Sequence, residues 1–171
     1  YALIIEALIK LFETTSTLNY IETAEKITQE VFNQFYNHKN KMFAYKSHYD
    51  TPLVNETFEI YDNVISSSNS IMANNLYKLG KILNQENYIE QAKQMLANVQ
   101  EKILDYPTGF ANWINLYLNF TYPYKEFVIV GENANEFSKQ IQQFYIPNAI
   151  FVATETESLE ITQNRFIENK T

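Results

Sequence analysis

Residues 61–70, YDNVISSSNS, place many polar side chains between two apolar, periodic stretches of the sequence. Asp62 could act as a general acid or base there, with Asn63 and Asn69 donating hydrogen bonds to ligand hydroxyls. Ser and Asn before an apolar helix are also favoured N-caps, each worth roughly 1 kcal/mol. One cap explains only one or two of these residues. We therefore expect a site with Asp62 as the catalytic group and these ligand-binding residues: Glu59, Tyr61, Asn63, Ser67, Asn69 and Ser70.

A hydrolase that works with paired carboxylates, such as a glycosidase, would need a second carboxylate, roughly 5 to 9.5 Å from the first. Glu56 and Glu59 are nearest in sequence to Asp62, but on an extended strand they point to opposite faces. At most one of them could share a cavity with Asp62. A solvated strand edge is the simpler interpretation of both, and the partner carboxylate could lie outside this sequence.

The histidines and aromatic residues add little to this site. His38 and His48 fit polar surface turns, and Gly131 alone is far from a glycine-rich phosphate loop. Most of the 13 Tyr and 12 Phe fall on apolar stripes and are explained by packing. Four aromatic residues near residues 38–61 could instead stack on a sugar ring: Tyr45, Tyr49, Phe58 and Tyr61.

The composition argues against several classes of partner. A net charge of -7 and a single arginine, Arg165, leave no basic stripe for a nucleic-acid backbone. With no cysteine, the sequence has no disulfide, thiolate nucleophile or CxxC metal site. No apolar run reaches the roughly 18 residues of a membrane helix, and the N-terminal stretch is not a signal peptide. We expect no cofactor, no metal, no nucleic acid, no membrane contact and a cytoplasmic location.

Repeated helical hairpins are the elements that must position the polar cluster. Residues 2–15 are apolar around most of the helix, which predicts burial, whereas residues 20–36 carry one apolar stripe. The pair recurs, since LNYIETAEKI at 18–27 matches ENYIEQAKQM at 86–95, with Tyr20 and Tyr88 lying 68 residues apart. A further helix, buried like the first, is predicted at 108–121. At the same offset, three residues of the first helix match three further on: Leu8, Lys10 and Leu11 with Leu76, Lys78 and Leu79.

Two segments are expected to contain strands. Between the hairpins, residues 38–61 predict a β-hairpin insert made of MFAYKSHY and VNETFEIY. After residue 123, EFVIVG and AIFVAT predict two buried strands, separated by a helix with Phe137, Ile141 and Phe144 on one side. Strand, helix and strand with short links predict a βαβ unit with parallel strands. The run RFIE at 165–168 could add another strand.

Alternating buried and amphipathic helices in hairpins are typical of an α/α toroid. A straight solenoid is the competing geometry, because tetratricopeptide units repeat about every 34 residues and two of them give the same offset. The long insert counts against a closely stacked array. We expect a mainly α fold, with residues 1–122 forming helical hairpins of an incomplete (α/α)6 toroid and residues 123–171 forming a small α/β appendage.

The sequence resembles the thioredoxin-domain proteins with a six-hairpin, glycosidase-like toroid, which include the spermatogenesis-associated thioredoxin-like proteins. The similar stretches are YDNVISSSNSIMANNLYKL at 61–79, YALIIEALIKLFETT with YIETAEKI, and the closing FVIVG and FYIPNAIFV. Ser66 stands where the family usually has proline. The resemblance implies a C-terminal fragment, with a thioredoxin-like domain and the first toroid hairpins upstream.

Members of that family look similar to N-acylglucosamine 2-epimerases and toroidal glycosidases, which implies a sugar-like ligand at the toroid mouth. The loops before inner helices would bring Asp62 and its neighbours to that mouth, while neither histidine matches an epimerase motif. Whether the domain is an enzyme stays open. The alternative is a non-catalytic scaffold that packs against the thioredoxin-like domain. A partial toroid would expose its inner faces, so we also expect self-association or association with the missing segments.

Overall fold

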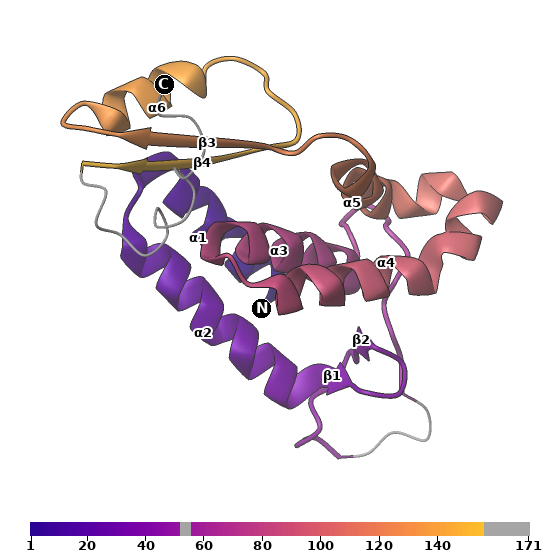
Figure 1. Ribbon diagram of the computed structural model, residues 1–171. Coiled ribbons are helices and arrows are strands. Elements are labelled where there is room, and N and C mark those ends of the chain that lie inside the picture. The colour runs from indigo at the N-terminus through magenta and orange to yellow at the C-terminus, as the bar shows by residue number, and fades with distance from the viewer. Residues whose placement is uncertain (52–55, 156–171) are drawn as a thin grey trace.

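The computed structural model describes residues 1–51 and 56–155, and it shows a mainly α-helical protein with a small parallel sheet (Figure 1). The predicted strand at 165–168 lies outside these residues. No helix in the described part of the chain is long and apolar enough to cross a membrane. The larger helices are α1 (Ala2–Thr15), α2 (Leu18–Phe35), α3 (Ser68–Leu83), α4 (Glu86–Asp105) and α5 (Ala111–Thr121).

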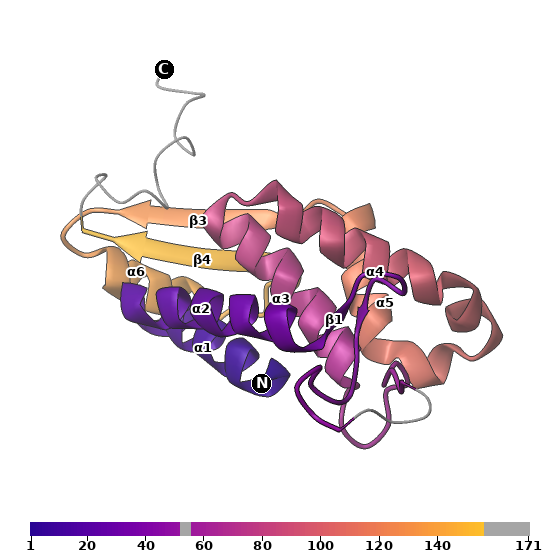
Figure 2. The same ribbon diagram turned by 90° about the horizontal axis from the view of Figure 1, so that it is seen from below.

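The helices form two layers, with α3 at the centre of the inner one. Helix α3 contacts α1 on one side and α5 on the other, and α2 and α4 pair with α1 and α3 as hairpins (Figures 1 and 2). Eleven of the 16 residues of α3 are buried, against four of the 18 residues of α2. A 3-10 turn, Pro107–Phe110, leads into α5. The largest fully buried side chains between the layers include Trp113, Phe12, Phe110, Ile5, Ile9 and Leu76.

The sequence repeat is also a repeat of backbone geometry. Helices α1 and α3 both end at a residue in the left-handed conformation, Ser16 with φ 57° and Asn84 with φ 55°. The N–H of Ser16 donates to the carbonyl of Phe12, and the N–H of Asn84 donates to the carbonyl of Gly80. Each of these residues lies 68 positions from its counterpart, so the prediction of a repeated helical hairpin is confirmed.

Helix α1 is less buried than its sequence predicts. Ile5, Ile9 and Phe12 are fully covered, but Leu3 and Ile4 are 55% and 54% exposed. The prediction of burial nearly all round is wrong for this helix within the described residues, because its neighbours α2, α3, β4 and α6 leave Leu3 and Ile4 uncovered.

The insert differs from the predicted hairpin. Its strands are β1 (Tyr36–Asn37) and β2 (Met42–Phe43), which pair antiparallel, while residues 56–61 form no strand. The predicted β-hairpin of MFAYKSHY with VNETFEIY is therefore wrong for the part that the structure describes, although one backbone hydrogen bond joins the two segments, from the N–H of Tyr45 to the carbonyl of Thr57 at 2.9 Å. A side chain takes the place of the second strand, because the amide of Asn69 bonds to both backbone groups of Phe43.

The C-terminal unit confirms the predicted βαβ topology. Strands β3 (Lys125–Val130) and β4 (Ala149–Thr154) pair in parallel, and α6 (Ala134–Ile141) connects them. In Figure 1 the strands run beside the ends of α1 and α3, which both contact β4. Of the three apolar residues predicted on one side of this helix, Ile141 is half-buried while Phe137 and Phe144 are 55% and 73% exposed, and the buried residues of α6 are Ala134 and Ser138.

Candidate functional site

Asp62 joins the first turns of two inner helices. Its Oδ1 accepts hydrogen bonds from the N–H of Ser67 at 2.9 Å and the hydroxyl of Ser70 at 2.6 Å. Its Oδ2 accepts from the N–H of Asn112, at the start of α5, at 2.8 Å. The N–H groups in the first turn of a helix have no partner within the helix, so a carboxylate placed here satisfies them. In the structure, Asp62 therefore acts as a clamp between α3 and α5.

Three of the expected ligand-binding residues are fully buried in the same region: Ser67, Asn69 and Ser70. Ser67 caps α3, because its hydroxyl accepts from the N–H of Ser70 at 3.2 Å. Asn69 donates to the carbonyls of Phe43 at 2.9 Å and Glu59 at 3.0 Å, and accepts from the N–H of Phe43 at 2.8 Å. A ligand could reach these side chains only by breaking these bonds, so the structure gives them a structural role.

The other expected site residues lie on the surface but do not converge. The carboxylate of Glu59 accepts from the N–H of Ser68 at 3.0 Å, which adds a second cap to α3. Tyr61 is 54% exposed and packs against the ring of Phe110. Asn63 accepts from the N–H of its neighbour Val64. A role for Glu59, Tyr61 or Asn63 in ligand binding stays a prediction.

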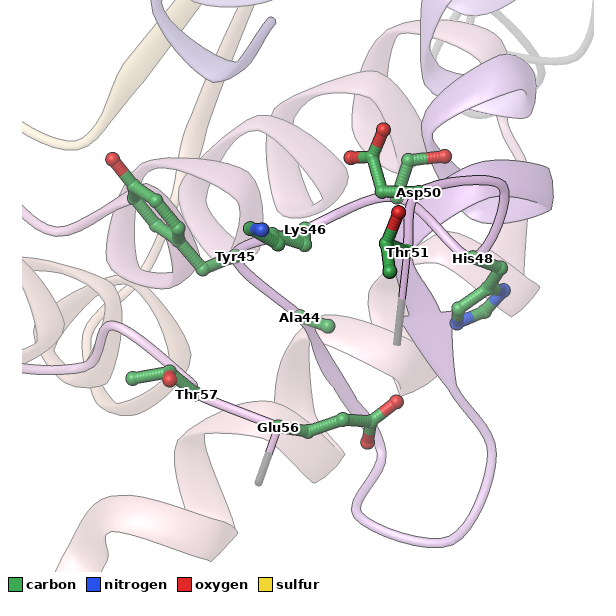
Figure 3. A pocket seen from close by; sticks show the side chains of 9 residues that line it. Ala44, Tyr45, Lys46, His48, Asp50, Thr51, Glu56 and Thr57 are labelled. Atoms are coloured by element: carbon green, nitrogen blue, oxygen red, sulfur yellow. The ribbon is translucent and has the colours of Figure 1, made fainter. Parts of the chain in front are cut away.

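A hollow of about 280 Å³ lies in the insert, between residues 44–51 and residues 56–57 (Figure 3). Figure 3 shows Tyr45 and His48 at opposite sides of it, with the carboxylate of Glu56 on the neighbouring segment of chain. The titratable side chains point in different directions, so they form no acid and base pair. Tyr45 is 69% exposed and also borders a smaller apolar hollow beside Ala2 and Met72.

A third hollow, of about 380 Å³, is lined by polar side chains from all three inner helices, and we call it the polar hollow. Helix α1 contributes Glu6 and Lys10, and α3 contributes Asn74 and Lys78. Tyr124 and residues 145–149 line it next to the sheet. The residues contributed by α5 are Asn112, Asn115 and Asn119.

No local motif of the sequence marks the polar hollow, but the repeat contains a signal for it. Glu6 and Asn74 are 68 residues apart, as are Lys10 and Lys78. Polar residues therefore recur at equivalent positions of two mostly apolar helices, which places them on the same side of the inner layer. Such a recurrence marks a face that is not covered by the outer helices.

The two lysines of the polar hollow differ in their partners. Lys10 forms an ion pair with Glu13, with 2.6 Å between Nζ and Oε2. Lys78 has no hydrogen bond or ion pair with any residue that the structure describes. Burial lowers the pKa of Lys78, repulsion from Lys10 lowers it further, and attraction to Glu13 and Glu6 acts in the opposite direction. The ammonium of Lys78 therefore has donors free for a ligand.

The asparagines of the polar hollow are held by their amide nitrogens. Asn74 donates to the carbonyls of Ser70 at 2.9 Å and Asn112 at 3.0 Å, and Asn112 donates to the hydroxyl of Ser70 at 3.0 Å. Among residues 1–51 and 56–155, nothing donates to their side-chain oxygens, which leaves these as acceptors for a ligand. Since Asp62 binds both Ser70 and the backbone of Asn112, it positions one wall of the hollow.

Comparisons with known proteins give similarity without an activity. No protein-family model matches the sequence. A protein of Caenorhabditis elegans described as uncharacterized is 24% identical over 161 residues, which cover 92% of this chain and 22% of that protein. The chain is thus similar, over nearly all its length, to one part of a much longer protein.

Proposed function

We propose that the chain is part of an α/α toroid like that of the thioredoxin-domain proteins it resembles, and that it binds a sugar-like small molecule in the cytoplasm. The polar hollow carries this proposal. Its walls come from three successive inner helices, and it offers a free ammonium at Lys78 together with the amide oxygens of Asn74 and Asn112. A polyhydroxylated ligand uses both kinds of group, because each hydroxyl donates one hydrogen bond and accepts others.

The charges around the polar hollow favour a neutral ligand over an anionic one. Lys10 and Lys78 are balanced by Glu6, which lines the hollow, and by Glu13, which pairs with Lys10. The site therefore has no excess of positive charge to attract a phosphate or a carboxylate. This balance supports a neutral sugar or polyol.

The geometry supports binding more than bond cleavage. Glycoside hydrolysis uses two carboxylates across the scissile bond. Glu6 is the only carboxylate residue among those described that line the polar hollow, and both carboxylate oxygens of Asp62 accept hydrogen bonds from the protein. We therefore propose that the residues lining the polar hollow bind a sugar, and that Asp62 positions the helices that carry them.

Calorimetric titration against neutral mono- and disaccharides tests the proposal. We expect at least one sugar to bind, and Lys78→Met to weaken its binding at least tenfold, because one hydrogen bond to a charged group contributes roughly 1.5 to 3 kcal/mol. Lys102→Met is the matched control, since Lys102 is an exposed lysine of α4 outside the hollow. Absence of binding by every sugar, or equal binding by the Lys78 variant, would contradict the proposal.

A non-catalytic scaffold is the second candidate, and a different observation favours it. Helix α1 exposes apolar side chains at Leu3, Ile4 and Leu11, which are 55%, 54% and 42% exposed. Exposed apolar patches of this kind mark protein interfaces. A scaffold would bind a protein partner, such as the thioredoxin-like domain implied by the resemblance, and would show no heat with any sugar.

A further inference from the structure

Two lysines at equivalent positions of the repeat line the polar hollow, but their surroundings differ. The side chain of Lys10 is 60% exposed and forms an ion pair with Glu13. Lys78 is half-buried, and its amine has no hydrogen bond or ion pair with any residue that the structure describes. Taking an unpaired ammonium out of water is unfavourable. An unpaired lysine in a hollow of ligand size is therefore a candidate for a chemical role.

The charged groups that face Lys78 come from α1. Burial and repulsion from Lys10 lower the pKa of Lys78, and together they outweigh the attraction of Glu13 and Glu6. Tyr124 lines the hollow next to the sheet and adds no charge, because burial raises its pKa. A lowered pKa increases the fraction of Lys78 that is a neutral amine, which is the nucleophilic form.

Glu6 provides a proton carrier in the same hollow. Its half-buried carboxylate has no hydrogen bond or ion pair within the described part of the chain, and its charge reaches Lys78. The side chains of Asn74 and Asn112 add acceptor oxygens but do not titrate. The hollow thus combines one nucleophile with one acid and base group, the pair that addition to a carbonyl uses.

We propose that the neutral amine of Lys78 forms a reversible imine with the carbonyl carbon of an open-chain sugar in the polar hollow, and that Glu6 carries the protons. This inference rests on the sugar-binding function proposed above. It narrows the ligand to reducing sugars, whose open-chain form contains an aldehyde or a ketone. The same ligand offers hydroxyl groups to the amide oxygens of Asn74 and Asn112.

The reaction balances in atoms and charge. The nitrogen lone pair of Lys78 forms the C–N bond, and the π electron pair of the carbonyl moves to its oxygen. The carboxylate of Glu6 takes a proton from the nitrogen and delivers it to that oxygen, which gives a neutral carbinolamine. Glu6 then passes one proton from solvent to the hydroxyl, the C–O bond breaks, and the nitrogen lone pair forms the C=N bond. The products are a protonated imine and one water, and no oxidant or reductant is needed.

Reductive trapping tests the imine. The full-length protein is incubated at pH 7 with glyceraldehyde and sodium cyanoborohydride, which reduces an imine to a stable amine, and mass spectrometry of peptides gives the rate at each lysine. We expect Lys78 to be modified at least tenfold faster than Lys102, the exposed lysine of α4 outside the hollow. Sorbitol, a polyol without a carbonyl, should slow the modification of Lys78 and leave that of Lys102 unchanged.

The variant Glu6→Gln separates proton transfer from electrostatics. Its carboxylate raises the pKa of Lys78, so by charge alone its removal would speed the reaction at pH 7. If Glu6 carries the protons, the modification of Lys78 becomes at least tenfold slower in this variant, while that of Lys102 does not change. An unchanged or faster rate at Lys78 would overturn the role of Glu6.

The remaining outcomes distinguish the imine from the sugar site. Equal rates at Lys78 and Lys102 would overturn the imine, and binding of sorbitol in calorimetry would still support the sugar site, because that binding needs no carbonyl. Fast modification of Lys78 that sorbitol does not slow would overturn the reaction of a bound sugar. In that case Lys78 is reactive outside the proposed function.

Discussion

At the scale of single residues, Asp62 connects the expected site with the observed one. It was expected to contact a ligand, and in the structure its carboxylate binds Ser67, Ser70 and Asn112. Two of these partners begin α3, and the third begins α5. Asn112 in turn lines the polar hollow. Asp62 therefore affects the proposed site through the positions of two helices.

The substitution Asp62→Ala is expected to destabilise the protein by about 2 to 3 kcal/mol. It leaves the N–H groups of Ser67 and Asn112 without an acceptor and removes one of the two acceptors of the Ser70 hydroxyl, and donors that lose a partner when buried cost roughly 1 to 3 kcal/mol. Urea denaturation measures the change. Asn63→Ala is the control and is expected to change the free energy of unfolding by less than about 0.5 kcal/mol, because Asn63 is exposed. A loss below 1 kcal/mol for Asp62→Ala would contradict the clamp.

The sequence predicted only part of the residue chemistry. Ser67 caps a helix, as Ser before an apolar stretch predicts. The partner of Asp62 at Asn112 lies 50 residues further on, so no local pattern predicts it. The polar hollow depends on three helices packed side by side, and a spacing rule on one helix cannot bring their side chains together. The signal in the sequence is the recurrence of polar residues in the repeat, Glu6 with Asn74 and Lys10 with Lys78.

At the scale of elements, the spacing of apolar residues predicted the helices and strands that bury one side against the core. The five larger helices and the parallel βαβ unit were all predicted, because stripes of apolar residues record which side of an element faces the core. The strand that was predicted to pair with Met42 and Phe43 does not form among the described residues. The side chain of Asn69 instead bonds to the backbone of Phe43, at the strand edge where the second strand was expected. The apolar side of the predicted helix 134–141 did not indicate its buried residues, because α6 packs through the small residues Ala134 and Ser138.

The caps of α1 and α3 allow a prediction at this scale. Ser16 has φ 57°, a conformation that is strained for most residues and free of strain for glycine. We expect Ser16→Gly to stabilise the protein by about 0.5 kcal/mol, the relief of strain being partly offset by the greater freedom of glycine in the unfolded chain. Thermal unfolding measures the gain. Ser16→Ala keeps the strain and serves as the control, so an equal gain from alanine would contradict the explanation.

At the scale of the whole molecule, the buried Tyr77 and the half-buried Tyr124 join the helical layers to the sheet. Tyr77 of α3 donates to the carbonyl of Asn119 at 2.9 Å, and its ring lies 5.1 Å from that of Tyr124, just before β3. Burial raises the pKa of Tyr77 to about 12, and the nearby carboxylate of Glu126 adds to the effect. Burial also raises the pKa of Tyr124, with contributions from Glu13, Tyr77 and Glu126. Ionisation of either phenol therefore opposes the contact between the two parts of the molecule.

These shifts predict a loss of stability in alkali. Below pH about 10, the unfolded value, both phenols stay protonated in both states, and above it the unfolded state loses its protons first. The free energy of unfolding should therefore fall as pH rises from about 10 through about 12 for Tyr77. Lys78 opposes this trend, because its lowered pKa makes stability rise with pH up to its unfolded value near 10.5. In urea titrations across this range, Tyr77→Phe should flatten the fall, while the exposed Tyr106→Phe leaves it unchanged. Lys78→Met should remove the opposing rise below pH about 10.5 and leave the slope above that pH unchanged. Equal slopes for Tyr77→Phe and the unsubstituted protein would mean that the phenol of Tyr77 is not a source of the alkaline loss.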